Sequence, residues 1–279
     1  MRSVVISGSS TGIGASTAKV LIGRGFRVYG GVRRKADGER LRRELGERFE
    51  PLHFDVTDRP AVDAAAALVG QRLDGQTLCG LVNNAGIAVL GPLLHLAPDD
   101  FRRQLEVNLV GQLHVTQAFA PMLGAGNAFA GAPGRIVMMS SVAGRNASPF
   151  MGPYNTSKFG LEGFSECLRR ELMLFGIDVI VIAPGAVATP IWDKADAFDP
   201  DRLAHTPYAG ALRIARRAID DGRRGLPAER IGNVVHTALT ASRPKIRYVV
   251  TPTRLVRWLT DTLPKRVVDR IVAKRLGWQ

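Results

Sequence analysis

The sequence is poor in cysteine, in aromatic residues and in long apolar runs. Its 279 residues include two cysteines, Cys79 and Cys167, which stand far apart with no Cys-x-x-Cys pair or histidine cluster beside them. We therefore expect no disulfide framework, no metal site and a reducing compartment. No apolar run approaches the roughly 18 residues of a membrane span, and residues 4–6 are too short a run for a signal peptide core. These absences favour a cytoplasmic protein.

Acidic residues are also few relative to basic ones. The chain has 38 Lys and Arg against 25 Asp and Glu, a formal net charge of +13. Such an excess fits nucleic acid, an anionic membrane, an acidic ligand or solubility alone. Because no set of base-stacking aromatics and no helix-turn-helix pattern accompanies the charge, we expect no nucleic-acid partner. Arginines such as Arg40, Arg42 and Arg43, on an expected charged helix, need only solvent.

Short β-branched apolar runs alternate with longer helical patterns. Strands are expected near residues 4–6, 27–29, 52–54, 78–82, 135–139, 178–182 and 247–250. Helical segments are expected near residues 13–24, 37–48, 60–72, 99–123, 154–174 and 228–241. This alternation predicts an α/β fold, a single Rossmann-type, doubly wound, seven-stranded parallel sheet flanked by helices on both faces.

A glycine-rich turn follows the first expected strand. The turn contains three glycines, Gly8, Gly12 and Gly14, with Ser10 and Ile13 between them. A strand that turns tightly into a helix needs glycine where φ is positive or where a diphosphate approaches the backbone. The helix N-terminus then offers free N–H groups and a positive dipole end to that diphosphate. The pattern indicates a dinucleotide site, although a glycine turn without a ligand is the alternative.

The end of the second strand carries arginine in place of an acid. An NAD site usually has Asp or Glu here to hold the ribose 2′-OH, whereas a 2′-phosphate favours Arg. Arg33 and Arg34 follow the strand, and an arginine fork suits a phosphate in charge and in bidentate geometry. The segment favours NADP(H), with NAD(H) as the alternative cofactor. The two arginines could also form a solvated basic turn that binds no phosphate.

Further segments match one protein family in order and spacing. They are Asn83-Asn84-Ala85-Gly86 after the fourth strand, Asn108 in the long helix, Ser141 after the fifth strand, Tyr154 with Lys158, and Pro184-Gly185. Together with the glycine turn, they resemble the short-chain dehydrogenase/reductase family over about residues 2–250. The stretch from Tyr154 to Phe164 looks most like the hydroxysteroid and retinol dehydrogenase branch. The resemblance implies an NAD(P)-dependent oxidoreductase that acts on alcohols and carbonyl compounds.

The residues themselves support carbonyl–alcohol chemistry. A free tyrosine has a pKa of about 10 and is a poor base at neutral pH. Lys158 lies four residues after Tyr154 on the same helix face, where its ammonium group favours the phenolate. Ser141, at a strand end, can hydrogen-bond the substrate oxygen opposite Tyr154. By resemblance, Lys158 also binds the nicotinamide ribose, and Asn108 holds a water in a proton relay.

The resemblance assigns further cofactor contacts. They are Asp55 and Val56 at the adenine, Asn83, Ala85 and Gly86 along the cofactor, and Pro184, Gly185, Val187 and Thr189 near the carboxamide. The chain departs from the family at Ser7, where Thr is commoner, but both residues carry a hydroxyl group.

The segment at about 187–225 is where the family builds a substrate lid. It contains Ile191, Trp192, Phe198, Leu203 and Tyr208, which suit an apolar ligand or simply pack the lid on the core. With Ser141 and Tyr154, Trp192 is an expected substrate contact. The substrate class is a hydrophobic secondary alcohol or ketone, steroid-, retinoid- or lipid-like. The alternatives are an NAD-dependent alcohol dehydrogenase of the same family and a non-catalytic dinucleotide sensor or interaction protein.

The last segment differs from the rest. We expect a catalytic dinucleotide-binding domain at 1–250 and a basic amphipathic helical extension at 251–279, interrupted by Pro264. Its apolar face would pack over the substrate pocket or on a partner subunit, or it would lie on an anionic membrane; we favour packing. Relatives associate through the helices near 99–123 and 154–174, so a homodimer or homotetramer is expected.

Overall fold

A computed structural model of the protein describes residues 1–191, 200–252 and 262–278. Seven strands form one parallel sheet in the order β3-β2-β1-β4-β5-β6-β7, as the sequence predicts. The strands are β1 (Ser3–Ile6), β2 (Arg27–Val32), β3 (Phe49–His53), β4 (Gly80–Asn83), β5 (Arg135–Met139), β6 (Asp178–Pro184) and β7 (Arg247–Val250). The order reverses between β1 and β4, which is where such sheets place their ligands.

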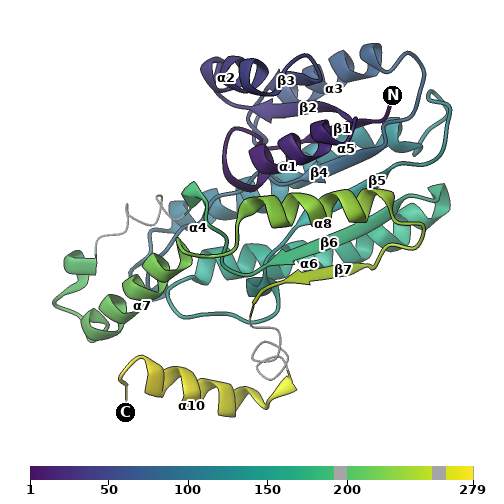
Figure 1. Ribbon diagram of the computed structural model, residues 1–279. Helices are drawn as coiled ribbons and strands as arrows, with labels where there is room; N and C mark the ends of the chain where they lie inside the picture. The colour runs from purple at the N-terminus through teal and green to yellow at the C-terminus, as the bar shows by residue number, and fades with distance from the viewer. Residues whose placement is uncertain (192–199, 253–261, 279) are drawn as a thin grey trace.

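Helices cover both faces of the sheet (Figure 1). One face carries α1 (Gly12–Gly23), α2 (Lys35–Leu45) and α8 (Ala228–Thr240), and the other carries α3 (Arg59–Arg72), α5 (Gly111–Phe119) and α6 (Gly152–Glu171). Successive strand residues alternate between the two cores, so that Val4 and Ile6 pack on the first face and Val5 packs on the second. Strands buried on both faces explain the continuous apolar runs in the sequence.

The helix expected at 99–123 is not continuous, and this correction affects the site. The segment consists of α4 (Pro98–Leu105), a π-helical turn η2 (Glu106–Val110), α5 and a 3₁₀ turn η3 (Ala120–Leu123). Pro121 ends the α-helical pattern because it has no backbone N–H group to donate. The π turn inserts an extra residue that a helical period does not reveal.

The remaining described elements lie mainly at the carboxyl end of the sheet. They are the 3₁₀ turns η1 (Leu93–His95), η4 (Val142–Gly144), η5 (Leu172–Phe175) and η7 (Pro200–Leu203), and the helices α7 (Ala209–Gly222) and α10 (Lys265–Arg275). The lid segment, expected to be irregular, thus contains a four-turn helix, α7.

The C-terminal helix α10 begins directly after Pro264. Val268 on α10 is buried, and the ring of Trp278 lies 6.2 Å from that of Phe150 in an edge-on arrangement. The end of the tail therefore packs on the segment that leads into α6. The first apolar run of the tail, with Leu255, Trp258 and Leu259, lies outside the described residues. No helix in the described part of the chain is long and apolar enough to cross a membrane.

Candidate active site

A cleft opens at the carboxyl ends of the strands, over the point where the strand order reverses. It gathers most of the residues that the sequence singles out. Those lining it are Gly8, Ser10, Gly12, Ile13, Arg33, Asp55, Val56, Ala85, Gly86, Ser141, Tyr154, Lys158, Pro184, Gly185, Val187 and Thr189. Four expected residues do not line it, namely Gly14, Arg34, Asn83 and Asn108. Trp192 lies outside the described residues.

The glycine turn has the shape that a diphosphate requires. Gly8 and Gly12 have φ values of +66° and +58°, a region that glycine tolerates best. Gly14 serves packing, because a Cβ atom there would stand 2.3 Å from the Gly8 carbonyl oxygen. The first turn of α1 has no acidic residue, and Thr11 at its N-cap makes no side-chain capping bond. The N-terminal N–H groups of α1 are thus left to an anion, and the turn fits a dinucleotide.

Asn84 holds the glycine turn in place, a role that the sequence did not reveal. Its Nδ2 donates to the carbonyl oxygens of Ser7 at 3.0 Å and Gly8 at 2.9 Å. In return, the Ser7 hydroxyl accepts from the backbone N–H groups of Asn84 at 3.0 Å and Ala85 at 3.1 Å. Ser7 therefore binds through its hydroxyl group, which Thr would also supply.

Asn83, expected beside the cofactor, instead lies in the core. Its Nδ2 donates to Thr116 Oγ1 of α5 at 2.8 Å, and the side chain is fully buried. Asn83 is two residues after Leu81, which packs on the same core. The alternation of the strand directs both side chains to that face.

Arg33 and Arg34 have different surroundings. Arg33 lines the cleft, and its Nη1 lies 3.6 Å from Asp55 Oδ2 with two thirds of the side chain exposed. Arg34 begins α2 and is bound to Asp37, with Nε to Oδ2 at 2.8 Å. Of these two arginines, Arg33 lines the cleft and is available to a phosphate, whereas Arg34 does not line it and is bound closely to Asp37.

Tyr154, Lys158 and Ser141 converge from two elements. Tyr154 and Lys158 lie one turn apart on α6, with Lys158 Nζ 5.7 Å from the Tyr154 ring centroid. Lys158 Nζ also donates to the Met139 carbonyl oxygen at 2.7 Å, at the end of β5. Ser141 caps the η4 turn, where its Oγ accepts from the Ala143 N–H group at 3.1 Å. The three side chains thus face the same space, and the nearly buried Lys158 is held at its Nζ.

Burial controls the ionisation of this group. It raises the pKa of Tyr154, while a hydrogen bond with Ser141 acts in the opposite direction. Burial also lowers the pKa of Lys158 to about 8, against which the carboxylate of Glu162 raises it. The pKa of Lys158 thus lies close to neutral pH, and Tyr154 stands one helical turn away. A small change in the charges around them can therefore decide which of the two groups holds a proton.

Asn108 lies behind the cleft in the π turn. Its Oδ1 accepts from the Ile87 N–H group at 2.9 Å, and its Nδ2 donates to the Ile87 carbonyl oxygen at 3.1 Å and to Ser157 Oγ at 3.0 Å. The Ser157 hydroxyl donates to the Tyr154 carbonyl oxygen at 2.7 Å. Asn108 thus connects to α6 through Ser157, and π turns of this kind often occur at functional sites.

The comparisons with known proteins agree with this geometry. A family model described as short chain dehydrogenase matches residues 2–199. The chain belongs to this family. It is 36% identical over 278 residues to the NADPH-dependent 3-dehydrocapnine reductase of Ornithobacterium rhinotracheale, covering 99% of this chain and 98% of that protein. It is 34% identical over 285 residues to human retinol dehydrogenase 5, covering 96% and 87% of the two chains.

Solved short-chain dehydrogenases share the fold. A 3-oxoacyl-[acyl-carrier protein] reductase from Brucella melitensis, with bound NAD, superposes with a TM-score of 0.69 at 28% identity, over 90% of this chain and 89% of that one. A short-chain dehydrogenase from Streptomyces avermitilis superposes with a TM-score of 0.75 at 22% identity, over 99% and 95%. The protein is accordingly an NAD(P)-dependent oxidoreductase, as the sequence predicts. The relatives agree with NADP(H) as its expected cofactor and NAD(H) as the alternative.

In this short-chain dehydrogenase, several lining residues of the cleft are apolar. They include Ile87, Val142, Met151 and Ile191, together with the polar residues Asn146 and Ser148. Beyond Met151, the rings of His95, Phe150, Tyr208 and Trp278 meet edge-on, with centroids 5.8–6.2 Å apart. The sequence suggested Tyr208 only as part of the lid, because the four residues come from four separate segments.

Proposed function

We propose that this protein interconverts a hydrophobic secondary alcohol and its ketone with NADP(H), through Ser141, Tyr154 and Lys158. One observation carries the proposal. The three side chains line the same cleft as the glycine turn, so a substrate oxygen and a bound nicotinamide can meet there. A non-catalytic dinucleotide sensor has no use for a buried tyrosine and lysine at this place, which argues against that alternative.

Each side chain has a separate task in ketone reduction. A nicotinamide cofactor held by the glycine turn and Lys158 would supply the hydride that the carbonyl carbon takes up. The Tyr154 hydroxyl donates its proton to the carbonyl oxygen, and Ser141 Oγ donates a hydrogen bond that fixes this oxygen in place. Lys158 stabilises the resulting phenolate by its positive charge. Asn108, which contacts α6 through Ser157, supports the return of a proton to the Tyr154 phenolate, and alcohol oxidation follows the same steps in reverse.

Arg33 supports the preference for NADP(H). Asp55, the nearest carboxylate, accepts with its Oδ1 from the backbone N–H at 3.0 Å and the hydroxyl at 2.9 Å of Thr57, and only its Oδ2 faces Arg33. The exposed guanidinium can therefore turn toward a 2′-phosphate, with charge-assisted hydrogen bonds. NAD(H) remains the alternative cofactor, although no acid stands at the end of β2 to hold a free ribose 2′-OH.

The apolar lining residues of the cleft support a hydrophobic substrate. Ile87, Val142, Met151 and Ile191 line the same cleft as Ser141, and Phe150 of the aromatic group directly precedes Met151 in the chain. Apolar walls with a few polar groups are typical of sites that bind apolar ligands. The names of the relatives, a 3-dehydrocapnine reductase and a retinol dehydrogenase, fit this class. The lid at about 187–225, which includes α7, would cover the bound substrate.

A substrate panel tests the proposal. Purified protein is given NADPH or NADH with steroid, retinoid and long-chain lipid ketones and with small polar sugars, and nicotinamide absorbance is followed. We expect turnover of the hydrophobic ketones and a higher kcat/KM with NADPH. Turnover of polar sugars alone would contradict the substrate class. NADPH binding without turnover of any carbonyl compound or alcohol would favour the sensor.

A further inference from the structure

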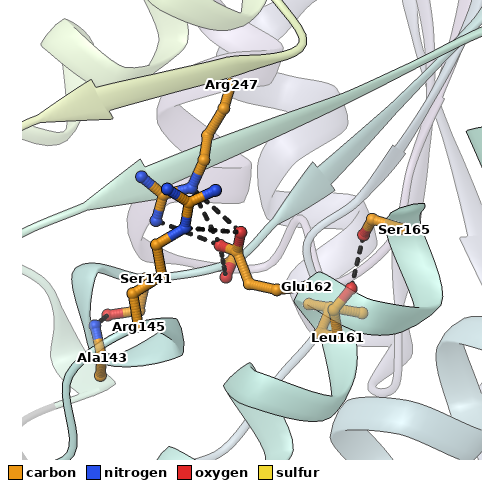
Figure 2. Close-up of polar contacts among 8 residues, drawn as sticks. Ser141, Ala143, Arg145, Leu161, Glu162, Ser165 and Arg247 are labelled. Atoms are coloured by element: carbon orange, nitrogen blue, oxygen red, sulfur yellow. Dashed lines mark hydrogen bonds and ion pairs between the residues drawn. The ribbon is translucent and has the colours of Figure 1, made fainter.

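A buried carboxylate stands one helical turn beyond the catalytic lysine. Glu162 follows Lys158 by four residues on α6, and its side chain is 15% exposed. Arg247 of β7 donates from Nε to Glu162 Oε2 at 3.0 Å, and Arg145 lies 3.7 Å from the same oxygen. Figure 2 shows the two guanidinium groups converging on this one carboxylate from separate segments.

The same carboxylate reaches the segment that carries Ser141. Ser140 Oγ donates to Glu162 Oε1 at 2.8 Å, and Ser140 immediately precedes Ser141. On the other side, Lys158 Nζ donates to the carbonyl oxygen of Met139. Two side chains of α6, one turn apart, therefore hold consecutive residues of this segment. Lys158 binds Met139, and Glu162 binds Ser140.

Gly144 makes room for this contact. A Cβ atom at Gly144 would stand 2.9 Å from both Glu162 Cγ and Ser140 Oγ, and 3.0 Å from the Lys158 carbonyl oxygen. The η4 turn thus passes directly over the bond between the serine hydroxyl and the carboxylate. Any larger residue at 144 would displace one of the three groups.

A purely structural ion pair does not account for this arrangement. Buried ion pairs add little net stability, because desolvation offsets the attraction of the charges. An ion pair between α6 and β7 would also need no serine. The hydrogen bond from Ser140 to the carboxylate fixes the backbone next to Ser141, and the position of that backbone decides where the Ser141 hydroxyl points.

We propose that Glu162 is a positioning residue that holds Ser141 in register with Tyr154, acting through the Ser140 hydroxyl. This rests on the proposed roles of Ser141, Tyr154 and Lys158. Arg145 and Arg247 lie beside the carboxylate with the opposite charge, which compensates for its partial removal from water. A displacement of about 1 Å at a catalytic group can lower the rate on the order of 100-fold. A hydrogen bond that fixes the position of Ser141 therefore has a direct effect on the rate.

Glu162 also acts on the charge of the site. The groups that face Lys158 and Glu162 are Tyr154 on α6, Arg145 after η4 and Arg247 on β7. The carboxylate favours the ammonium form of Lys158, and its removal leaves burial to lower the pKa of Lys158 further below 8. The lysine then loses its proton at a lower pH, so the alkaline limb of the pH–rate profile moves to lower pH.

Two variants and a matched control test the proposal. Ser140→Ala removes the hydrogen bond alone, and Glu162→Gln removes the charge. Glu166→Gln makes the same change one turn further along α6, at an exposed residue bound to Arg170. We expect kcat to fall about tenfold or more in Ser140→Ala and Glu162→Gln, with KM for NADPH unchanged. The alkaline limb should move only in Glu162→Gln, and Glu166→Gln should match the unmodified protein.

A second readout does not depend on turnover. The Ala143 amide donates to Ser141 Oγ, so its hydrogen exchange reports where that hydroxyl lies. We expect faster exchange at Ala143 in Ser140→Ala and Glu162→Gln than in Glu166→Gln, with NADPH affinity and melting temperature retained. Unchanged exchange and rate in both variants would overturn the proposal, as would losses that only follow a lower melting temperature. If the unmodified protein reduces no ketone, the proposed function fails and the exchange result alone decides this inference.

Discussion

At the scale of single residues, the proposed chemistry depends on the phenolic hydroxyl group of Tyr154. Tyr154→Phe removes the acidic proton and leaves the ring in place, so turnover should fall by roughly 10²–10⁴-fold, the usual contribution of general acid–base catalysis. NADPH affinity, followed by fluorescence titration, should change little. Tyr248→Phe is the control, because that hydroxyl only accepts from the Lys245 N–H group. Retained activity in Tyr154→Phe would contradict the assigned role.

The two adjacent arginines allow a matched test of cofactor preference. Arg33 lines the cleft, whereas Arg34 does not line it and is bound to Asp37. A hydrogen bond to a charged group contributes on the order of 1.5–3 kcal/mol, so Arg33→Ala should weaken NADPH binding by about tenfold or more. NADH binding should change much less, and Arg34→Ala should affect neither cofactor. Equal losses for NADPH and NADH in Arg33→Ala would remove the argument for the 2′-phosphate.

At the scale of elements, the start of α1 depends on how closely it approaches the glycine turn. A methyl group at Gly14 would meet the Gly8 carbonyl oxygen at 2.3 Å and Asn84 Nδ2 at 2.7 Å. Gly14→Ala should therefore lower the free energy of unfolding by about 1–3 kcal/mol, as overpacking usually does. It should also weaken NADPH binding, because α1 must shift away from the turn. Thermal unfolding and cofactor titration measure both effects.

The control lies on the same helix. Gly23 at the end of α1 has nothing within 4 Å of its added Cβ atom. Gly23→Ala should leave stability unchanged or raise it by roughly 0.5–1 kcal/mol, because alanine is the better helix former. If both variants behave alike, the close approach at Gly14 is not what holds the turn.

Elements with a clear period were predictable, and local irregularities were not. All seven strands follow from apolar runs, and most helices from their period, although α7 was not expected. The π turn at Glu106–Val110, which carries Asn108, was not predicted. One inserted residue scarcely alters the hydrophobic pattern of a helix. Asn83 lies in the core and not beside the cofactor, and the alternation from Leu81 could have predicted this. The hydrogen bond between Ser140 and Glu162 joins segments that are distant in the sequence, so no local sequence pattern predicts it.

At the scale of the whole molecule, the net charge of +13 has several separate origins. Arg40, expected to need only solvent, donates to the Ser10 carbonyl oxygen at 2.7 Å and so holds the glycine turn from α2. Arg42 similarly donates to the Phe49 carbonyl oxygen. The cations of α10 are exposed while Val268 packs inward. Much of the positive charge thus serves the fold or lies on one C-terminal helix.

The outer helices leave apolar side chains in water when the chain is alone. Val110, Leu113 and Phe159 on η2, α5 and α6 are each more than a third exposed, and η2 packs against α6. Exposed apolar residues that gather on adjacent elements mark contact surfaces. We therefore expect a homodimer or homotetramer built on this face, with a mass by light scattering that is a whole multiple of the single chain.

Charge placed on that face should separate the subunits. Leu113→Glu combined with Phe159→Glu buries two unpaired carboxylates in the expected interface, which is strongly unfavourable, so the protein should elute as a monomer. Ile246→Glu is the control, because Ile246 is an even more exposed apolar residue but precedes the edge strand β7. A monomer before any substitution would contradict the prediction. An unchanged oligomer in the double variant would place the interface on another surface.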